Sequence, residues 1–70
     1  MNRIPVQSSD IRSVGYEVES KTLEIEFVSG GLYEYYSVPK TVHDGLMAAS
    51  SKGAYFHQFI KDCYPFKRLR

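Results

Sequence analysis

The side chains best suited to bind an anion lie in the second half of the chain. Residues 36–70 hold six basic and two acidic side chains, whereas residues 1–35 hold three basic and six acidic ones. Ser51, Lys52 and Gly53 stand where a helix is expected to begin, and free N–H groups at a helix N-terminus beside a lysine attract anions. N-capping alone would also explain Ser51, so both interpretations of this segment stay open.

Tyr55 and Tyr64 accompany the basic residues and could stack on nucleic acid bases, while the cations attract the phosphates. Cations that are dispersed along a chain give weak binding that falls steeply with salt. The candidate RNA- or anion-binding residues are Ser51, Lys52, Gly53, Tyr55, Lys61, Lys67 and Arg68.

Few residues could act as catalysts or bind a metal. His57 and Cys63 are six positions apart, which places them on different faces of one helix and argues against a nucleophile pair. His43 and Asp44 are adjacent, so we do not expect them to face each other. Cys63 is expected in the core, and no spacing of His, Cys, Asp and Glu suits a metal. We therefore predict a protein that is not an enzyme and that uses neither a metal nor a cofactor.

Length and composition predict one folded domain over residues 1–70. A chain this short buries only about 60% of the surface that its unfolded form exposes. The single cysteine cannot form an internal disulfide, which favours a reducing cytoplasm. The N-terminus lacks the apolar segment of a signal peptide, and no apolar run approaches the roughly 20 residues of a membrane helix. We expect a cytoplasmic monomer that does not bind membranes.

Three segments of the first half alternate apolar and polar residues, as half-buried strands do. The first runs from Asp10 to Val18, the second from Thr22 to Val28, and the third follows the glycines at positions 30 and 31. The connection between the first two strands allows a two-residue or a four-residue loop. With either loop, the inward residues are expected to be Val14, Tyr16 and Val18, opposite Leu23, Ile25 and Phe27. The outward residues are expected to be Glu17, Glu24, Glu26 and Glu34, around Tyr36.

The loop of the second hairpin decides which way its tyrosines face. A two-residue loop would place Glu34 in the core without a partner, at a cost of several kcal/mol. A three-residue loop that ends with Gly30 in the left-handed conformation leaves Glu34 on the solvated face. We therefore predict that the inward pairs are Tyr33 with Ile25 and Tyr35 with Leu23.

Helical periodicity begins after the third strand. Pro39 suits the first helical position, and Val42, Leu46 and Ala49 follow on one face, which predicts a helix from about Pro39 to about Ser50. Ser51 is a good N-cap for a second helix that ends near Asp62 or Cys63, before Pro65. The apolar face of this second helix would hold Phe56, Phe59, Ile60 and Cys63.

The order of these elements predicts an α+β fold, a three-stranded antiparallel meander (β-β-β-α-α) with two helices packed on one face. The residues at 66–70 are too few to assign. The other face of the sheet is expected to be acidic and open to water. The predicted structural core includes Tyr33, Tyr35, Phe27, Phe56 and Phe59.

Three motifs resemble the KTSC domain family: Phe27-Val28-Ser29-Gly30-Gly31-Leu32-Tyr33-Glu34-Tyr35, then Val38-Pro39, then Ser51-Lys52-Gly53-Ala54-Tyr55-Phe56. The resemblance spans about residues 9–68, which makes this the expected core of a single KTSC-like domain. It implies a short domain that occurs at the C-terminus of some lysyl-tRNA synthetases and as a free-standing bacterial protein. It brings no catalytic residues, and its synthetase connection suggests RNA or tRNA as a partner. His57 stands where the family favours Asn, and Lys61 where it often has Arg.

Two functional hypotheses follow. The first is a non-catalytic module that binds RNA weakly through the basic helical and C-terminal surface. The second is a protein–protein interaction module that uses the acidic sheet face or an unpaired strand edge, because an acidic face repels phosphates but can bind a partner protein.

Overall fold

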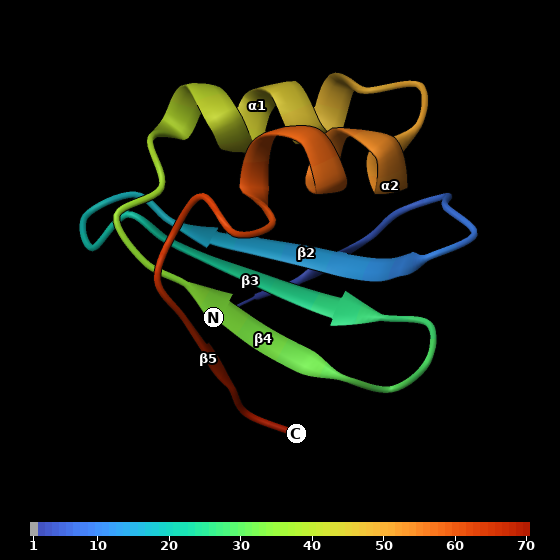
Figure 1. Ribbon diagram of the computed structural model, residues 1–70, viewed down its shortest axis with the longest axis horizontal. Helices are drawn as coiled ribbons and strands as arrows, with labels where there is room; N and C mark the ends of the chain where they lie inside the picture. Colours follow the sequence, from blue (N-terminus) through green and yellow to red (C-terminus); the bar gives the residue numbers. More distant parts are fainter. Residues whose placement is uncertain (1) are drawn as a thin grey trace.

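The computed structural model describes residues 2–70 and shows an antiparallel sheet with all helices on one face (Figure 1). The α+β class is confirmed, but the sheet has five strands, in the order in which they occur along the chain, and the predicted three-stranded meander was too small. The elements are β1 (Ile4–Pro5), β2 (Ile11–Glu17), β3 (Thr22–Phe27), β4 (Leu32–Tyr35), α1 (Lys40–Ala48), α2 (Lys52–Tyr55), the π-helical turn η1 (Phe56–Ile60) and β5 (Phe66–Arg68).

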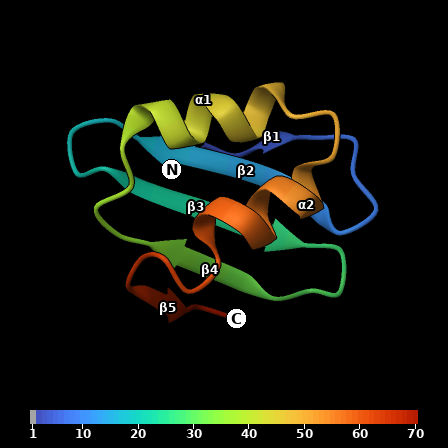
Figure 2. The ribbon, with the colours of Figure 1, turned by 45° about the horizontal axis from the view of Figure 1, so that its top comes forward.

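The two additional strands form the edges of the sheet (Figure 2). In β1, Ile4 pairs with Val14, and in β5, Phe66 pairs with Tyr35. Segments of two or three residues are too short to show a period of two, so the sequence pattern did not reveal them. Their pairing depends on contacts with distant strands.

The second hairpin has the predicted register. Ile25 pairs with Tyr33 and Leu23 pairs with Tyr35. The amide of Phe27 donates to the carbonyl of Gly31 at 2.8 Å, which closes the three-residue loop, and Gly30 has the expected positive φ of 108°. The cost of burying Glu34 was therefore the right criterion for choosing between the two-residue and the three-residue loop.

The first hairpin has the predicted inward residues except at its end, and its four-residue loop is one of the two that the sequence allowed. Val14 pairs with Ile25 and Tyr16 with Leu23. Val18 was expected inside, but it belongs to the four-residue turn after Glu17 and is exposed. A residue in the turn no longer follows the alternation of the strand.

Helix α1 runs from Lys40 to Ala48, so Pro39 is its N-cap and not its first helical residue, and the helix ends slightly earlier than expected. It crosses α2 closely at Gly45, where an added Cβ would lie 2.1 Å from the hydroxyl oxygen of Tyr55. This close approach explains a glycine in the middle of a helix, where it is otherwise unfavourable. Leu46 is the only fully buried side chain of α1.

The second helix widens into a π-turn, which changes the residues that face the core. The amide of Lys61 donates to the carbonyl of Phe56, five positions earlier, at 2.8 Å. Phe56 and Ile60 are buried as predicted, but Phe59 is 46% exposed and lies against Tyr55. Helical structure ends at Ile60, so Cys63 is also exposed. The predictions of Phe59 and Cys63 as core residues were therefore wrong, because they assumed α-helical spacing to the end.

The core lies between the sheet and the helices. Tyr35 is buried in it, whereas Tyr33 and Phe27 are partly buried and pack against it. Tyr35 contacts Phe56 at a ring distance of 5.7 Å, so the tyrosine strand does hold the second helix. The buried residues of this cluster are Ile11, Val14, Leu23, Ile25, Tyr35, Val38, Leu46, Phe56 and Ile60.

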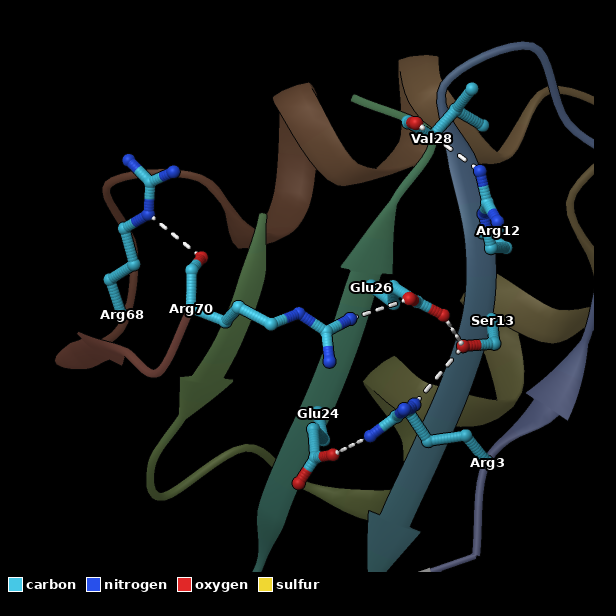
Figure 3. A network of polar contacts seen from close by, with 8 residues as sticks. All are labelled: Arg3, Arg12, Ser13, Glu24, Glu26, Val28, Arg68 and Arg70. Atoms are coloured by element: carbon cyan, nitrogen blue, oxygen red, sulfur yellow. Dashed lines mark hydrogen bonds and ion pairs between the residues drawn. The ribbon is translucent and has the colours of Figure 1, made fainter. Parts of the chain in front are cut away.

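Residues from both ends of the chain cover the opposite face of the sheet (Figure 3). Arg3, next to β1, forms an ion pair with Glu24 and donates from Nε to Ser13 at 3.2 Å. Arg70, after β5, forms an ion pair with Glu26 at 2.7 Å. Glu24 is only 7% exposed as a result. The expectation of an acidic face open to water was wrong, because the unassigned terminal segments bring cations onto it.

These cations and the hydroxyl of Ser13 stabilise the charged form of Glu26. Ser13 donates to Glu26 at 3.0 Å, and this hydrogen bond is the main reason why the pKa of Glu26 lies below its usual value. The positive charges of Arg3, Arg70 and Arg12 lower the pKa further, whereas burial opposes the shift.

Candidate functional site

A groove of about 400 Å³ lies beside β4 and β5, on the helical side of the sheet. One wall comes from Lys61 and Asp62, which follow η1, and the other from Phe66 and Arg68 of β5. The aromatic residues that line it are Phe27, Tyr33, Tyr35, Phe56 and Phe66.

The aromatic side chains of the groove form one connected cluster. The ring centroid of Phe66 lies 5.9 Å from that of Tyr33 and 5.7 Å from that of Tyr35. Tyr33 and Tyr35 are nearly parallel, with centroids 6.3 Å apart. Phe66 is 55% exposed, so this cluster presents an aromatic surface to solvent as well as to the core.

Two cations border this aromatic surface. The guanidinium carbon of Arg68 lies 5.5 Å from the centroid of the Tyr33 ring, within cation–π range. Its Nε donates to the carbonyl of Arg70 at 3.0 Å, which fixes the orientation of the guanidinium. Lys61 is exposed, and within residues 2–70 it forms no ion pair. Its ammonium is thus available to an anionic ligand.

Tyr35 places a polar group in the groove although its side chain is 95% buried, with 5% exposed. Its hydroxyl has no hydrogen-bond partner among residues 2–70, yet no side-chain oxygen or nitrogen there is both fully enclosed and unpaired. The hydroxyl is therefore not fully enclosed, and Tyr35 is one of the residues that line the groove. Burial raises the pKa of Tyr35 to about 12, with smaller effects from Tyr33 and Asp62. The hydroxyl keeps its proton and can donate.

The raised pKa of Tyr35 predicts a loss of stability in alkali. In the unfolded chain the phenol ionises near 10, whereas in the folded protein it stays neutral until about 12. The contribution of the neutral Tyr35 phenol to the free energy of unfolding is complete below pH 10 and is lost as the pH rises through 12. Urea unfolding between pH 10 and pH 12 should show a steep fall in the free energy of unfolding of the wild type and a smaller fall for Tyr35→Phe.

Tyr36→Phe is the matched control for this titration. Its hydroxyl donates to Glu34 at 3.0 Å on the other side of the sheet, and this bond raises its pKa. Absorbance of the phenolate should show that Tyr35→Phe, not Tyr36→Phe, removes the step at the highest pH. Loss of that step in Tyr36→Phe alone would contradict the assignment.

Four of the candidate residues from the sequence have other structural partners. Ser51 accepts from the amide of Ala54 at 3.3 Å and so caps α2. Lys52 donates to the carbonyls of Met47 and Ala49, at 3.1 and 3.0 Å, and so closes the end of α1. The two remaining residues are packed closely, Gly53 against Asp10 and Tyr55 against Gly45.

Lys61 and Arg68 both line the groove, whereas Lys67 lies on the other face of β5, paired with Glu34 in the sheet. Sequence reasoning missed Phe66 and Asp62, and it missed that Tyr33 borders a surface. Phe66 and Arg68 share a face because they are two apart on a strand, but three residues are too few to predict that strand from the sequence.

A second polar cluster lies around α1. His43 lies 3.1 Å from the carboxylate of Asp44, contrary to the expectation that these neighbours would not meet, and its ring stacks on Tyr16 at 4.8 Å. Lys40 binds the same carboxylate at 2.8 Å and is the main cause of its lowered pKa, with a smaller contribution from His43. No nucleophile joins this cluster. The part of the chain that the structure describes contains no group of three His, Cys, Asp or Glu side chains that could hold a metal.

None of the helices within residues 2–70 is long and apolar enough to span a membrane.

Comparison with known proteins gives consistent results. Residues 7–64 match the family model of the KTSC domain. An uncharacterised protein of Stutzerimonas stutzeri is 48% identical over 61 residues, which cover 87% of this chain and 86% of that protein. A lysine–tRNA ligase of Nostoc is 46% identical over 63 residues, covering 90% of this chain but 11% of the ligase. The crystal structure of a KTSC domain protein from Yersinia pestis superposes with a TM-score of 0.96 at 39% identity, covering 99% of this chain and 97% of that one. This chain therefore belongs to the KTSC domain family.

Proposed function

We propose that this chain is a small, non-catalytic module that binds RNA, such as tRNA, as an accessory to other RNA-binding proteins. The observation that carries the proposal is the groove in which Lys61 and Arg68 border a partly exposed aromatic cluster. Aromatic rings beside cations are the usual components of surfaces that bind single-stranded nucleic acid. The whole domain spans residues 1–70 in this proposal, and its proposed location is the cytoplasm.

The relatives support the proposal indirectly. The Nostoc relative is named a lysine–tRNA ligase, and the matching stretch is a small part of it. Three exposed cations, Lys61, Lys67 and Arg68, give weak and salt-dependent binding by themselves. Attachment to a larger RNA-binding protein would raise the effective concentration and make such binding useful. In a free-standing chain the same surface would act on abundant or multivalent RNA.

The proposal predicts where tRNA perturbs the protein. In an NMR titration at low salt, the amides of Lys61, Lys67 and Arg68 should shift more than those of Glu24 and Glu34. Replacing Lys61 by Gln should reduce the slope of log K against log salt by about 0.7, the contribution of one phosphate contact on a single strand. Lys67→Gln should have a smaller effect, because the side chain of Lys67 lies on the other face of β5.

Lys21→Gln is the matched control, because Lys21 is equally exposed but lies in the turn between β2 and β3. Its salt slope should equal that of the wild type. The absence of shifts at low salt would reject RNA binding. Shifts confined to the strand glutamates would reject the proposed surface.

The alternative, a protein interaction module on the acidic sheet face or a strand edge, has less support. Arg3 and Arg70 already bind two of the carboxylates of that face. The edge strands are short, and β5 carries Lys67 and Arg68, which discourage pairing with another strand. Light scattering that shows a dimer at high protein concentration would favour this alternative over the expected monomer.

A further inference from the structure

We propose that the groove between β5 and the turn after η1 binds one unpaired nucleotide of a single-stranded RNA. This inference rests on the proposed function and adds which part of the RNA is recognised. A volume of about 400 Å³ lies within the range of pockets that hold small molecules.

The stacking surface consists of Phe66 and Arg68. Phe66 is the most exposed ring of the groove, and the guanidinium plane of Arg68 is supported by the ring of Tyr33 beneath it. Unpaired bases stack on both aromatic rings and guanidinium planes. Because Phe66 also contacts Tyr33 and Tyr35, the core holds this stacking surface in place before the base binds.

The polar groups of the groove suit the edge of a base. The hydroxyl of Tyr35 forms no hydrogen bond within the described chain. It can donate one to a ring nitrogen or a carbonyl oxygen of a base. Asp62 lines the same groove and offers an acceptor for a base N–H. A hydroxyl donor and a carboxylate acceptor together match the mixed donor and acceptor edges that all four bases present when unpaired. An apolar ligand would leave both groups without partners.

The charges of the groove suit a phosphate at its rim. Lys61 and Arg68 both line the groove and come from different elements, the segment after η1 and strand β5. The carboxylate of Asp62 would repel a phosphate beside it, so the base edge lies toward Asp62 and Tyr35 and the phosphate toward the two cations. A paired base would keep its edge engaged in the duplex and its faces stacked, which excludes double-stranded RNA from this site.

The inference is tested with the full chain and a single-stranded RNA of about six nucleotides, compared with the blunt duplex of the same sequence. The single strand should bind and the duplex should bind at least about tenfold more weakly, since one stacked base accounts for a difference of that order. Phe66→Leu should weaken binding of the single strand by about tenfold. Tyr35→Phe, which removes only the hydroxyl, should weaken it by about fivefold.

Two variants control for these changes. Phe59→Leu removes a similarly exposed ring on η1 that does not line the groove, and Tyr36→Phe removes a hydroxyl on the other face of the sheet. Both should bind like the wild type. Circular dichroism should confirm that all four variants are folded, which is expected because Phe66 is exposed and phenylalanine fills the place of Tyr35.

The outcomes separate this inference from the proposed function. If Phe66→Leu and Tyr35→Phe bind normally while Lys61→Gln binds more weakly, RNA binding stands and the nucleotide site is rejected. Equal binding of the duplex also rejects the site. If the wild type binds neither RNA at low salt, the proposed function itself fails.

Discussion

Replacing Leu46 by alanine should lower the free energy of unfolding by about 2 to 5 kcal/mol, the usual cost of removing a fully buried leucine. Leu46 is the only completely buried side chain of α1, and the half-buried Val42 and Met47 provide its other apolar contacts with the core. A domain of this length has a total stability of about 4 to 10 kcal/mol, so the loss is a large share of it. Urea unfolding followed by circular dichroism measures the change.

Met47→Ala is the matched control for Leu46→Ala. It removes a side chain of similar size at the next position of α1, where the residue is only half buried. Its cost should be less than half that of Leu46→Ala, because less surface is returned to water. Equal losses in the two variants would show that α1 is held by its whole apolar face and not mainly by Leu46.

Replacing Arg3 by methionine should destabilise the protein by about 1 to 3 kcal/mol, because the carboxylate of Glu24 remains without its partner. Glu24 is almost fully covered, and Arg3 supplies both its ion pair and a hydrogen bond to Ser13. The apolar residues of β1 are exposed, so Arg3 adds to an attachment that otherwise consists of the pairing of β1 with β2 and the packing of Val6. The amide of Val6 donates to the carbonyl of Arg12, and its hydrogen exchange should be faster in Arg3→Met than in the wild type.

Two further variants identify the cause of that loss. Adding Glu24→Gln to Arg3→Met should restore part of the stability, since no unpaired charge is then buried. Arg12→Met should cost little, because Arg12 is exposed, donates to the carbonyl of Val28 at 3.4 Å and has only the smallest of the charge effects on Glu26. If Arg12→Met were as destabilising as Arg3→Met, the ion pair with Glu24 would not be the reason.

Local sequence patterns were sufficient for the centre of this protein. Alternation identified β2, β3 and β4, and the register of the last two followed from one energetic argument, the cost of burying Glu34. Pro39 and Ser51 correctly marked where α1 and α2 begin. Each of these features depends on residues that are close together in the sequence, so the sequence of this one chain is enough to predict them.

The candidate site could be predicted only in part. Lys61 and Arg68 were identified from their charge, but the groove requires Phe66 and Asp62, which local patterns did not select. The end of the second helix was also mispredicted, because the π-turn rotates Phe59 outward while Ile60 stays buried. Nothing in the local spacing distinguishes this turn from an α-helical one.

The sequence by itself thus determined the three central strands, the register of the second hairpin and, to within one residue, the starts of both helices, because period and capping act over a few residues. Only the tertiary structure decided that β1 and β5 complete the sheet, since strands of two or three residues exist through their pairing with distant partners. That pairing carries Arg3 and Arg70 onto the glutamates of one face. It also brings Phe66 and Arg68 beside the tyrosine strand and Lys61, and so creates a groove from residues that are far apart along the chain.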